Sequence, residues 1–347
     1  MIEFAERLVA TPSPSGDEGA VIELCATEME RLGYELSRDP EGKLLGTVGR
    51  GDARLLFDVH ADTVAAAAQG ATIADGCLIG RGACDVKGPM AALIHGVAVT
   101  TLEEVLEGAA LAVVLDRFSP DAAVIVEPTG GRAALAQRGR AELVVEVTGQ
   151  STHAAYPENG ANALEAAAAI LRALGDREVA RDPELGAAIL VATEAATEPF
   201  PANSVVPGLC RLRLDRRTLP GESAEGVLAE LEPSLAEAER YGARAEVSIS
   251  DAAVTTYTGR RLSAARWFPA WREQRTGFVD AVSGAVPVGP PAVFGTNGSI
   301  SAARGIPTVI FGPGDPELAH QDEEHIRLDE LTRGRRQFAA LASIACR

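Results

Sequence analysis

The chain has little positive charge, few aromatic residues and few cysteines for its length. Its 32 Lys and Arg residues are outnumbered by 49 Asp and Glu residues, which gives a formal net charge of −17. A field of this sign repels phosphate backbones and anionic lipid headgroups. We therefore expect neither nucleic acid nor a membrane as a partner.

No apolar run reaches the roughly 18 residues that are needed to cross a bilayer. The first residues, MIEFAERLVATPSP, lack the basic start and apolar block of a secretory signal. The five cysteines are scattered and form no CxxC pair, which argues against a disulfide framework or a zinc knuckle. These absences predict a cytoplasmic protein. A length of 347 residues with 46% hydrophobic residues predicts a globular chain of roughly two domains.

The first part of the chain has the pattern of an α/β domain. Apolar residues recur at helical spacing in residues 2–10, 18–33 and 90–106. Continuous apolar runs, typical of strands buried on both faces, occupy residues 54–59, 109–115 and 122–126. The same pattern returns late in the chain, with short strands at 291–294 and 308–311 and a final helix from Leu328.

An α+β domain is predicted to interrupt this first domain. The expected strands are 141–147, 187–193, 205–215 and 243–249, and the expected helices are 162–174 and 225–241. The resulting β-α-β-β-α-β order is that of a split βαβ, ferredoxin-like sandwich. We predict a discontinuous catalytic domain over 1–139 and 256–347, with an inserted domain over 140–255.

Imidazole and carboxylate side chains stand where predicted buried strands end. The candidates are His60 and Asp62 after strand 54–59, Asp85 before helix 90–106, Glu127 after strand 122–126, and His320 after strand 308–311. Sites in open α/β sheets form at the carboxyl ends of the strands, and these side chains suit Zn²⁺. Asp62 is placed to orient His60, and Asp85 is the candidate to bridge two ions.

Each of these residues also has an interpretation without a metal. A single His after a strand is more often a packed or solvated side chain. Asp85 ahead of Gly88-Pro89 suits a helix N-cap, and Glu127-Pro128 suits a turn. His325 lies beside Asp322-Glu323-Glu324 and is predicted to form a solvated pair with this acidic stretch. Spacing alone leaves these alternatives open.

The motifs around the candidates resemble the M20 metallopeptidase and deacylase family, which includes acetylornithine and succinyl-diaminopimelate deacylases and carboxypeptidase G. Tyr257-Thr258-Gly259 and Phe294-Gly295-Thr296-Asn297-Gly298 resemble the YgeY-like and lysine-biosynthesis carrier-protein hydrolase branches. The resemblance implies a zinc-peptidase-like α/β catalytic domain with an inserted α+β lid and dimerisation domain. The motifs that carry it are His60-Ala61-Asp62-Thr63, Gly80-Arg81-Gly82-Ala83-Cys84-Asp85, Glu127-Pro128-Thr129, Ser151-Thr152-His153-Ala154, Asn203-Ser204-Val205 and Asp215-Arg216-Arg217.

The resemblance also implies a role for each matching residue. It implies that His60 and Glu127 are ligands of one zinc, that His320 is a ligand of the other, and that Asp85 bridges the two. Asp62 would be the partner of His60. His153 would contact the substrate carbonyl across a homodimer, and Asn203 and Arg217 would be lid residues that hold the substrate carboxylate. The implied cofactor is one or two Zn²⁺ ions per chain, with Co²⁺ or Mn²⁺ as alternatives.

One departure from the family concerns the general base. Relatives carry a Glu-Glu pair between the motifs of Asp85 and Glu127, in which the first Glu is the base and the second binds the other zinc. Glu103-Glu104 fall at helical spacing and are predicted to be a solvated helix face, so Asp116, after strand 109–115, is the expected stand-in. Loss of a general base costs about 10²–10⁴ in rate.

Two functions follow from these residues. The first is a zinc-dependent amidohydrolase that cleaves an N-acyl amino acid or small peptide with metal-activated water, impaired by the missing pair. The alternative is a catalytically inactive relative that binds a small molecule or a protein.

Overall fold

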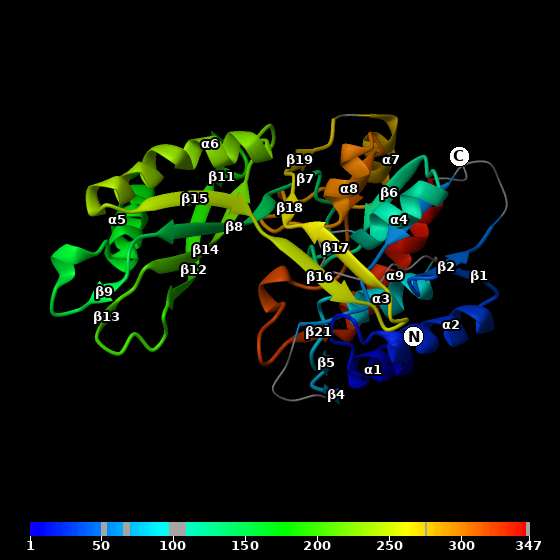
Figure 1. Cartoon of the computed structure of the whole chain (residues 1–347). Helices are drawn as coiled ribbons and strands as arrows, with labels where there is room; N and C mark the ends of the chain where they lie inside the picture. The colour runs from blue at the N-terminus through cyan, green and yellow to red at the C-terminus, as the bar shows by residue number, and fades with distance from the viewer. Residues whose placement is uncertain (50–53, 65–69, 97–108, 275, 345–347) are drawn as a thin grey trace. The chain divides into compact units, whose positions relative to one another are not determined.

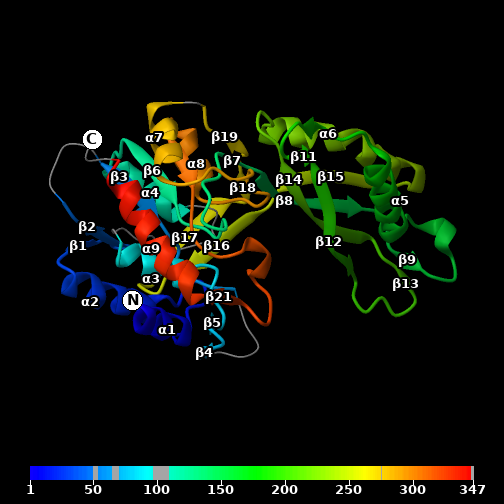
Figure 2. The same ribbon diagram turned by 180° about the vertical axis from the view of Figure 1, so that it is seen from behind.

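The computed structural model describes residues 1–49, 54–64, 70–96, 109–274 and 276–344 of the chain. These residues form two compact units (Figures 1 and 2). Unit 1 comprises Met1–Gln137, Ala252–Ala264 and Trp271–Arg347, and unit 2 comprises Arg138–Asp251 and Ala265–Ala270. The segment 265–270 therefore lies in unit 2, whereas the sequence analysis assigned it to the catalytic domain.

The centre of unit 1 is a parallel sheet in the order β20-β6-β3, made of Thr308–Ile310, Ala122–Ile125 and Leu55–Asp58. Leu56 and Ile125 pack into one apolar core together with α4, while Phe57 and Val124 pack into another with α1, α3 and α9. The sheet is thus covered on both faces, which explains why its strands are continuous apolar runs.

The helices of unit 1 cover the sheet, with α9 crossing it in Figure 2. Their bounds are α1 Ile2–Ala10, α2 Gly19–Arg31, α3 Lys87–Ile94, α4 Ala109–Arg117, α7 Gly277–Ala285, α8 Gly298–Ala303 and α9 Leu328–Ala342. The smaller pairings are β1 Glu35–Arg38 with β2 Leu44–Thr47, β4 Thr72–Ala74 and β21 His325–Arg327 with β5 Cys77–Ile79, β7 Ala136–Gln137 with β19 Trp271–Arg272, and β16 Asp251–Thr255 with β17 Arg261–Ala265.

Unit 2 is an antiparallel sheet in the order β12-β14-β8-β15, with α5 and α6 packed on one face (Figure 1). Its core lies between the helices and alternate strand residues, as along β14, where Leu212 and Leu214 are buried and Arg211 and Arg213 are exposed. The order confirms the predicted split βαβ fold. The bounds are β8 Gly139–Thr148, α5 Ala163–Asp176, β12 Ile189–Glu198, β14 Leu209–Thr218, α6 Ala224–Leu235 and β15 Arg244–Ile249, with the short β9 Thr152–His153, β10 Arg181–Asp182, β11 Gly186–Ala187, β13 Val205–Val206 and β18 Trp267–Phe268.

Two predicted strands of unit 1 are wrong. Residues 109–115 are part of helix α4, in which Leu111, Val114 and Leu115 are buried. These positions are three and four residues apart, so they form one helical face, and a short apolar run does not by itself distinguish a helix from a strand. Residues 291–294 form no strand and make only an isolated bridge from Ala292 to Gln137.

Two further features bear on the predictions. Glu103 and Glu104, predicted to lie on a solvated helix face, fall outside the described residues. Among the described helices, none has the length and apolar character needed to cross a membrane.

Candidate metal centre

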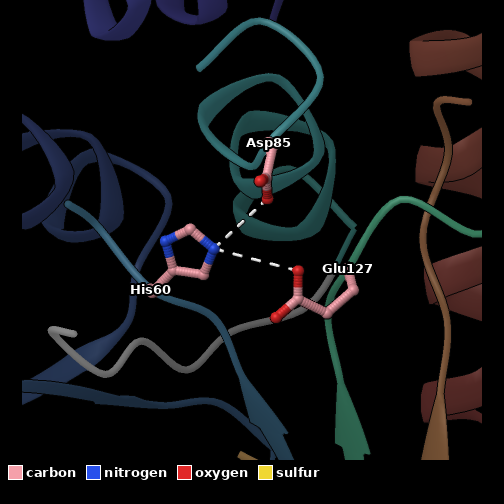
Figure 3. Close-up of side chains that lie close together, drawn as sticks. All are labelled: His60, Asp85 and Glu127. Atoms are coloured by element: carbon pink, nitrogen blue, oxygen red, sulfur yellow. Dashed lines mark ion pairs between the residues drawn. The ribbon is translucent and has the colours of Figure 1, made fainter. Parts of the chain in front are cut away.

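Three of the predicted ligands meet at one edge of the unit 1 sheet. Strands β3 and β6 are parallel neighbours with Asp58 opposite Ile125, so His60 and Glu127 each follow their strand by two residues at the same edge. Asp85 approaches from the loop before α3 (Figure 3). This is the edge at which open α/β sheets place their sites.

The ligand atoms of His60, Asp85 and Glu127 all lie within 4.8 Å of one another. His60 Nε2 is 3.4 Å from Asp85 Oδ1 and 3.8 Å from Glu127 Oε2 (Figure 3). Ligands at about 2.1 Å from a tetrahedral ion are separated from one another by about 3.4 Å. The two separations from His60 Nε2 are close to this value, so the three side chains fit around a common ion.

Close backbone packing holds two of these ligands in place. A Cβ atom at Gly312 would lie 2.5 Å from the carbonyl oxygen of Glu127, and one at Gly88 would lie 2.1 Å from the carbonyl oxygen of Ala83. Only glycine allows the segment after β20 to run against Glu127, and the loop of Asp85 to close against α3.

The second ring nitrogen of His60 faces Asp62. His60 Nδ1 lies 3.0 Å from the backbone oxygen of Asp62 and 3.5 Å from its Oδ1. Asp62 is fully buried and accepts a hydrogen bond from the hydroxyl of Ser15. A proton on Nδ1 leaves the Nε2 lone pair directed at Asp85 and Glu127, which is the tautomer that a metal ligand requires.

His320 approaches the other oxygen of Asp85. Its Nε2 lies 2.9 Å from Asp85 Oδ2, and its side chain is 47% exposed. Asp85 thus presents one carboxylate oxygen to His60 and the other to His320. A carboxylate in this arrangement is suited to bridge two ions.

Burial and neighbouring charges shift the carboxyl groups of the centre in different directions. Burial raises the pKa of Glu127, although His60 opposes this shift. Burial also acts to raise the pKa of Asp85, but the imidazoles of His320 and His60 beside its two oxygens outweigh burial and hold that pKa below its usual range. Burial raises the pKa of Asp58, at the end of β3, to about 7, despite a hydrogen bond from Asn297.

The residues present fit a divalent metal ion. Asp85 Oδ1 is buried and has no hydrogen-bond partner among the described residues, so an ion at this position would satisfy it. A divalent cation would also stabilise the ionised forms of Asp85 and Glu127, which burial otherwise disfavours. Imidazole and carboxylate donors are a ligand set of zinc and similar metals.

Glu324 lies beside this centre and was not among the residues predicted from the sequence. Its side chain is 1% exposed and accepts hydrogen bonds from the backbone N–H groups of Cys84 and Asp85, at 3.0 and 2.9 Å. It was grouped with a solvated acidic stretch because its neighbours Asp322 and Glu323 are charged and exposed. The apolar Ile326 in the following strand β21 was the available signal that this segment turns inward.

Asp116 lies in the last turn of α4, not at a strand end. Its Oδ1 pairs with Arg304 Nη2 at 2.7 Å, and its side chain is 67% exposed. The expectation that a strand would direct Asp116 to the sheet edge was wrong, because residues 109–117 are helical. Asp116 is not among the described residues whose ligand atoms cluster with His60.

The remaining candidates lie at opposite ends of the unit 2 sheet. His153 pairs with Val205 between β9 and β13, so Asn203 is close to it along the same ribbon. Arg217 lies near the end of β14, opposite Arg140 at the start of β8. Arg217 follows Leu209 by eight positions along β14, which is about 27 Å at 3.4 Å per residue. Both Nε and Nη2 of Arg217 contact the carboxylate of Asp215.

The fold is that of M20 peptidases. Aminopeptidase PepT from Bacillus cereus superposes with a TM-score of 0.78 at 19% identity, covering 100% of this chain and 98% of that one. The Bacillus subtilis protein YXEP, described as a dinuclear metal-binding peptidase of the M20 family, superposes with a TM-score of 0.71 at 16% identity, covering 99% and 96%.

Sequence comparison gives the same class. Residues 135–242 match the peptidase dimerisation domain of the M20 family. The chain is similar to M20 peptidases and to proteins named as deacylases, and the resemblance predicted from its motifs is confirmed. It is 29% identical to the uncharacterized protein YgeY of Escherichia coli K12, over 98% of this chain and 93% of that protein. It is also 29% identical to acetylornithine deacetylase of Myxococcus xanthus, over 83% and 79%.

Proposed function

We propose that the protein is a metal-dependent amidohydrolase that cleaves an N-acyl amino acid or a small peptide, with one or two zinc ions per chain. The observation that carries this proposal is the convergence of His60, Asp85 and Glu127, with ligand atoms within 4.8 Å of one another. Relatives named as deacylases, which match most of the chain, support the reaction class.

His60, Glu127 and Asp85 would hold one ion, and Asp85 and His320 would hold a second. When bound, the metal supplies a Lewis acid that activates water and polarises the amide carbonyl. Asp62 keeps the proton of His60 on Nδ1, so that Nε2 remains a donor to the metal. Burial of His60 and Asp85 strengthens the electrostatic contacts that they make.

The general base is the role that these residues do not fill. The family's base precedes the Glu127 motif, and the carboxylates in that interval include Asp116 and the pair Glu103 and Glu104. Asp116 was the expected base, but Arg304 engages its exposed carboxylate. We propose that the variants Asp116→Asn, Glu103→Gln and Glu104→Gln decide between them. The variant in which the general base is replaced is expected to lower kcat by about 10²–10⁴-fold, while its metal content stays at the wild-type level.

We further propose a homodimer formed through unit 2, in which His153 steadies the substrate carbonyl of the partner's site. The dimerisation-domain match supports this assembly. His153 and Asn203 lie on a ribbon at the end of the sheet away from Arg217 and Arg140. Such a ribbon is suited to reach a second copy, whereas Arg217 would contact substrate from the other end of the sheet.

A mixing experiment tests this division of labour. His60→Ala and His153→Ala proteins are each expected to be inactive, and exchange of their subunits should restore part of the activity. A mixed dimer combines one intact metal centre with the intact His153 of the other chain. If the mixture stays inactive after subunit exchange is verified, His153 does not act across the dimer.

The decisive test is amino acid release from a panel of N-acetyl and N-succinyl amino acids and dipeptides, with Zn²⁺, Co²⁺ or Mn²⁺ added after chelation. We expect turnover that the chelator abolishes and the metal restores. Absence of turnover across the panel, with metal bound, would favour the inactive binding relative. We also propose a cytoplasmic location, where the described cysteines Cys25, Cys77, Cys84 and Cys210 stay reduced.

A further inference from the structure

Glu324 connects two segments that are far apart in the sequence. It directly precedes β21, which pairs with β5 so that His325 lies opposite Ile79. The N–H of Gly80 donates to the backbone oxygen of Glu324 at 2.9 Å. Strand pairing therefore delivers Glu324 to the start of the loop that carries Asp85.

The side chain of Glu324 then reaches along this loop. Its Oε1 accepts hydrogen bonds from the backbone N–H groups of Cys84 and Asp85. A buried carboxylate that accepts two backbone hydrogen bonds fixes the peptide planes that donate them. The backbone of Asp85 is thus oriented by a residue 239 positions later in the chain.

Arg81 completes the connection with two arms of its guanidinium. Arg81 Nη1 donates to Glu324 Oε2 at 2.7 Å, and Arg81 Nη2 donates to the backbone oxygen of His320 at 3.3 Å. The guanidinium is planar, and its N–H groups point in fixed directions. The two hydrogen bonds therefore fix the distance between the carboxylate of Glu324 and the backbone oxygen of His320. The Arg81–Glu324 pair consequently links the backbone of Asp85 to the backbone of His320.

We propose that the Arg81–Glu324 pair is a positioning device that holds Asp85 and His320 at the separation needed to share a metal ion. The proposal rests on the function proposed above, since it assigns the pair to the same centre. Neither Arg81 nor Glu324 supplies a ligand atom. The pair acts on the loops that carry Asp85 and His320, as hydrogen-bonding partners of metal ligands do when they tune affinity.

Variants of similar size test separately the hydrogen bonds that Glu324 makes and those that Arg81 makes. In Glu324→Gln the amide oxygen still accepts from the backbone, but the amide nitrogen faces Arg81 and cannot accept. In Arg81→Lys the charge stays, but a single ammonium replaces the two-armed fork. Glu323→Gln removes the same charge from an exposed neighbour and serves as the control. The measurements are hydrogen exchange of segments 81–86 and 315–324, and zinc affinity by competition with a chelator.

We expect Glu324→Gln and Arg81→Lys to raise exchange in both segments and to lower zinc affinity by roughly 10–100-fold, while Glu323→Gln matches wild type. Unchanged exchange, or faster exchange with zinc affinity within twofold of wild type, would overturn the proposal. If wild type binds no zinc and cleaves no substrate, the proposed function fails. Hydrogen exchange without added metal still tests the positioning role of the Arg81–Glu324 pair. Rates in the Glu324→Gln and Arg81→Lys variants that equal those of wild type would overturn this role, and faster rates in both segments would support it.

Discussion

Nε2 of His320 lies 2.9 Å from Oδ2 of Asp85, on the carboxylate oxygen opposite to the one that faces His60. Asp85 is thereby the point at which two imidazole groups from distant segments meet. Because the side chain of Asp85 is buried, its charge needs compensation at both oxygens.

Replacing Asp85 with Asn should weaken metal binding at the centre without changing the size of the side chain. The amide lacks the charge and the second acceptor oxygen, so we expect zinc affinity and kcat/KM to fall by more than about 100-fold, since even partners of ligands contribute 10–100-fold. Metal content by elemental analysis and turnover on the best substrate measure this. Asp75→Asn, on an exposed turn, is the matched control. Retention of full metal content by Asp85→Asn would exclude Asp85 as a ligand.

Removing the hydroxyl of Ser15 should weaken the orientation of His60 through Asp62. Ser15→Ala is expected to lower metal affinity and kcat/KM by up to about tenfold, and Asp62→Asn by about 10–100-fold, because each loosens the hydrogen bonds behind a ligand. Ser15→Thr keeps a hydroxyl and should recover most of the loss. Ser37→Ala on the exposed strand β1 is the control. Equal affinities for Ser15→Ala and wild type would show that Ser15 does not orient Asp62.

Glu18 predicts a pH-dependent contribution to stability. Burial raises its folded-state pKa from 4.5 to about 7. A carboxyl group whose pKa is raised in the folded protein contributes to stability in its protonated form. This contribution is complete below the pKa of the unfolded state, and it is lost as the pH rises through the pKa of the folded state. Glu18→Gln should therefore gain stability relative to wild type between pH 4.5 and 7 and level off above it.

The size of this gain is at most about 3 kcal/mol, at 1.36 kcal/mol per pKa unit. Urea unfolding at pH 4, 6 and 8 measures it, with Glu30→Gln on the exposed face of α2 as the control. A difference between Glu18→Gln and wild type that is the same at all three pH values would contradict the assignment.

The edge strand β12 predicts where a second copy binds. Within the described part of the chain β12 pairs only with β14. Ile189 and Val191 on this strand are 42% and 51% exposed, and a strand edge with apolar side chains favours association. If the proposed dimer forms through this strand, Val191→Glu should shift the protein from dimer to monomer in light scattering. Val293→Glu, at an exposed apolar residue of unit 1, should leave the dimer intact. A Val191→Glu protein that remains dimeric would place the interface elsewhere.

The local patterns of the sequence were sufficient for some elements and ambiguous for others. The strands that end before His60 and Glu127 were predicted because apolar runs bounded by polar residues are typical of a doubly covered sheet. The run 109–115 is also apolar throughout, yet it folds as α4 because Leu111, Val114 and Leu115 also satisfy helical spacing. Which spacing applies depends on the packing of α4 against the sheet, a tertiary contact that no local pattern contains.

The split βαβ unit, the covered parallel sheet and the motifs that resemble the M20 family could be predicted without a structure, because periodicity and short motifs are local properties of the chain. The folded arrangement was needed to show that Asp85 faces two imidazoles, that Asp116 pairs with Arg304, and that Glu324 is buried against Asp85. These contacts join residues up to 239 positions apart. Their geometry depends on how strands and loops pack, and not on the spacing of residues along the chain.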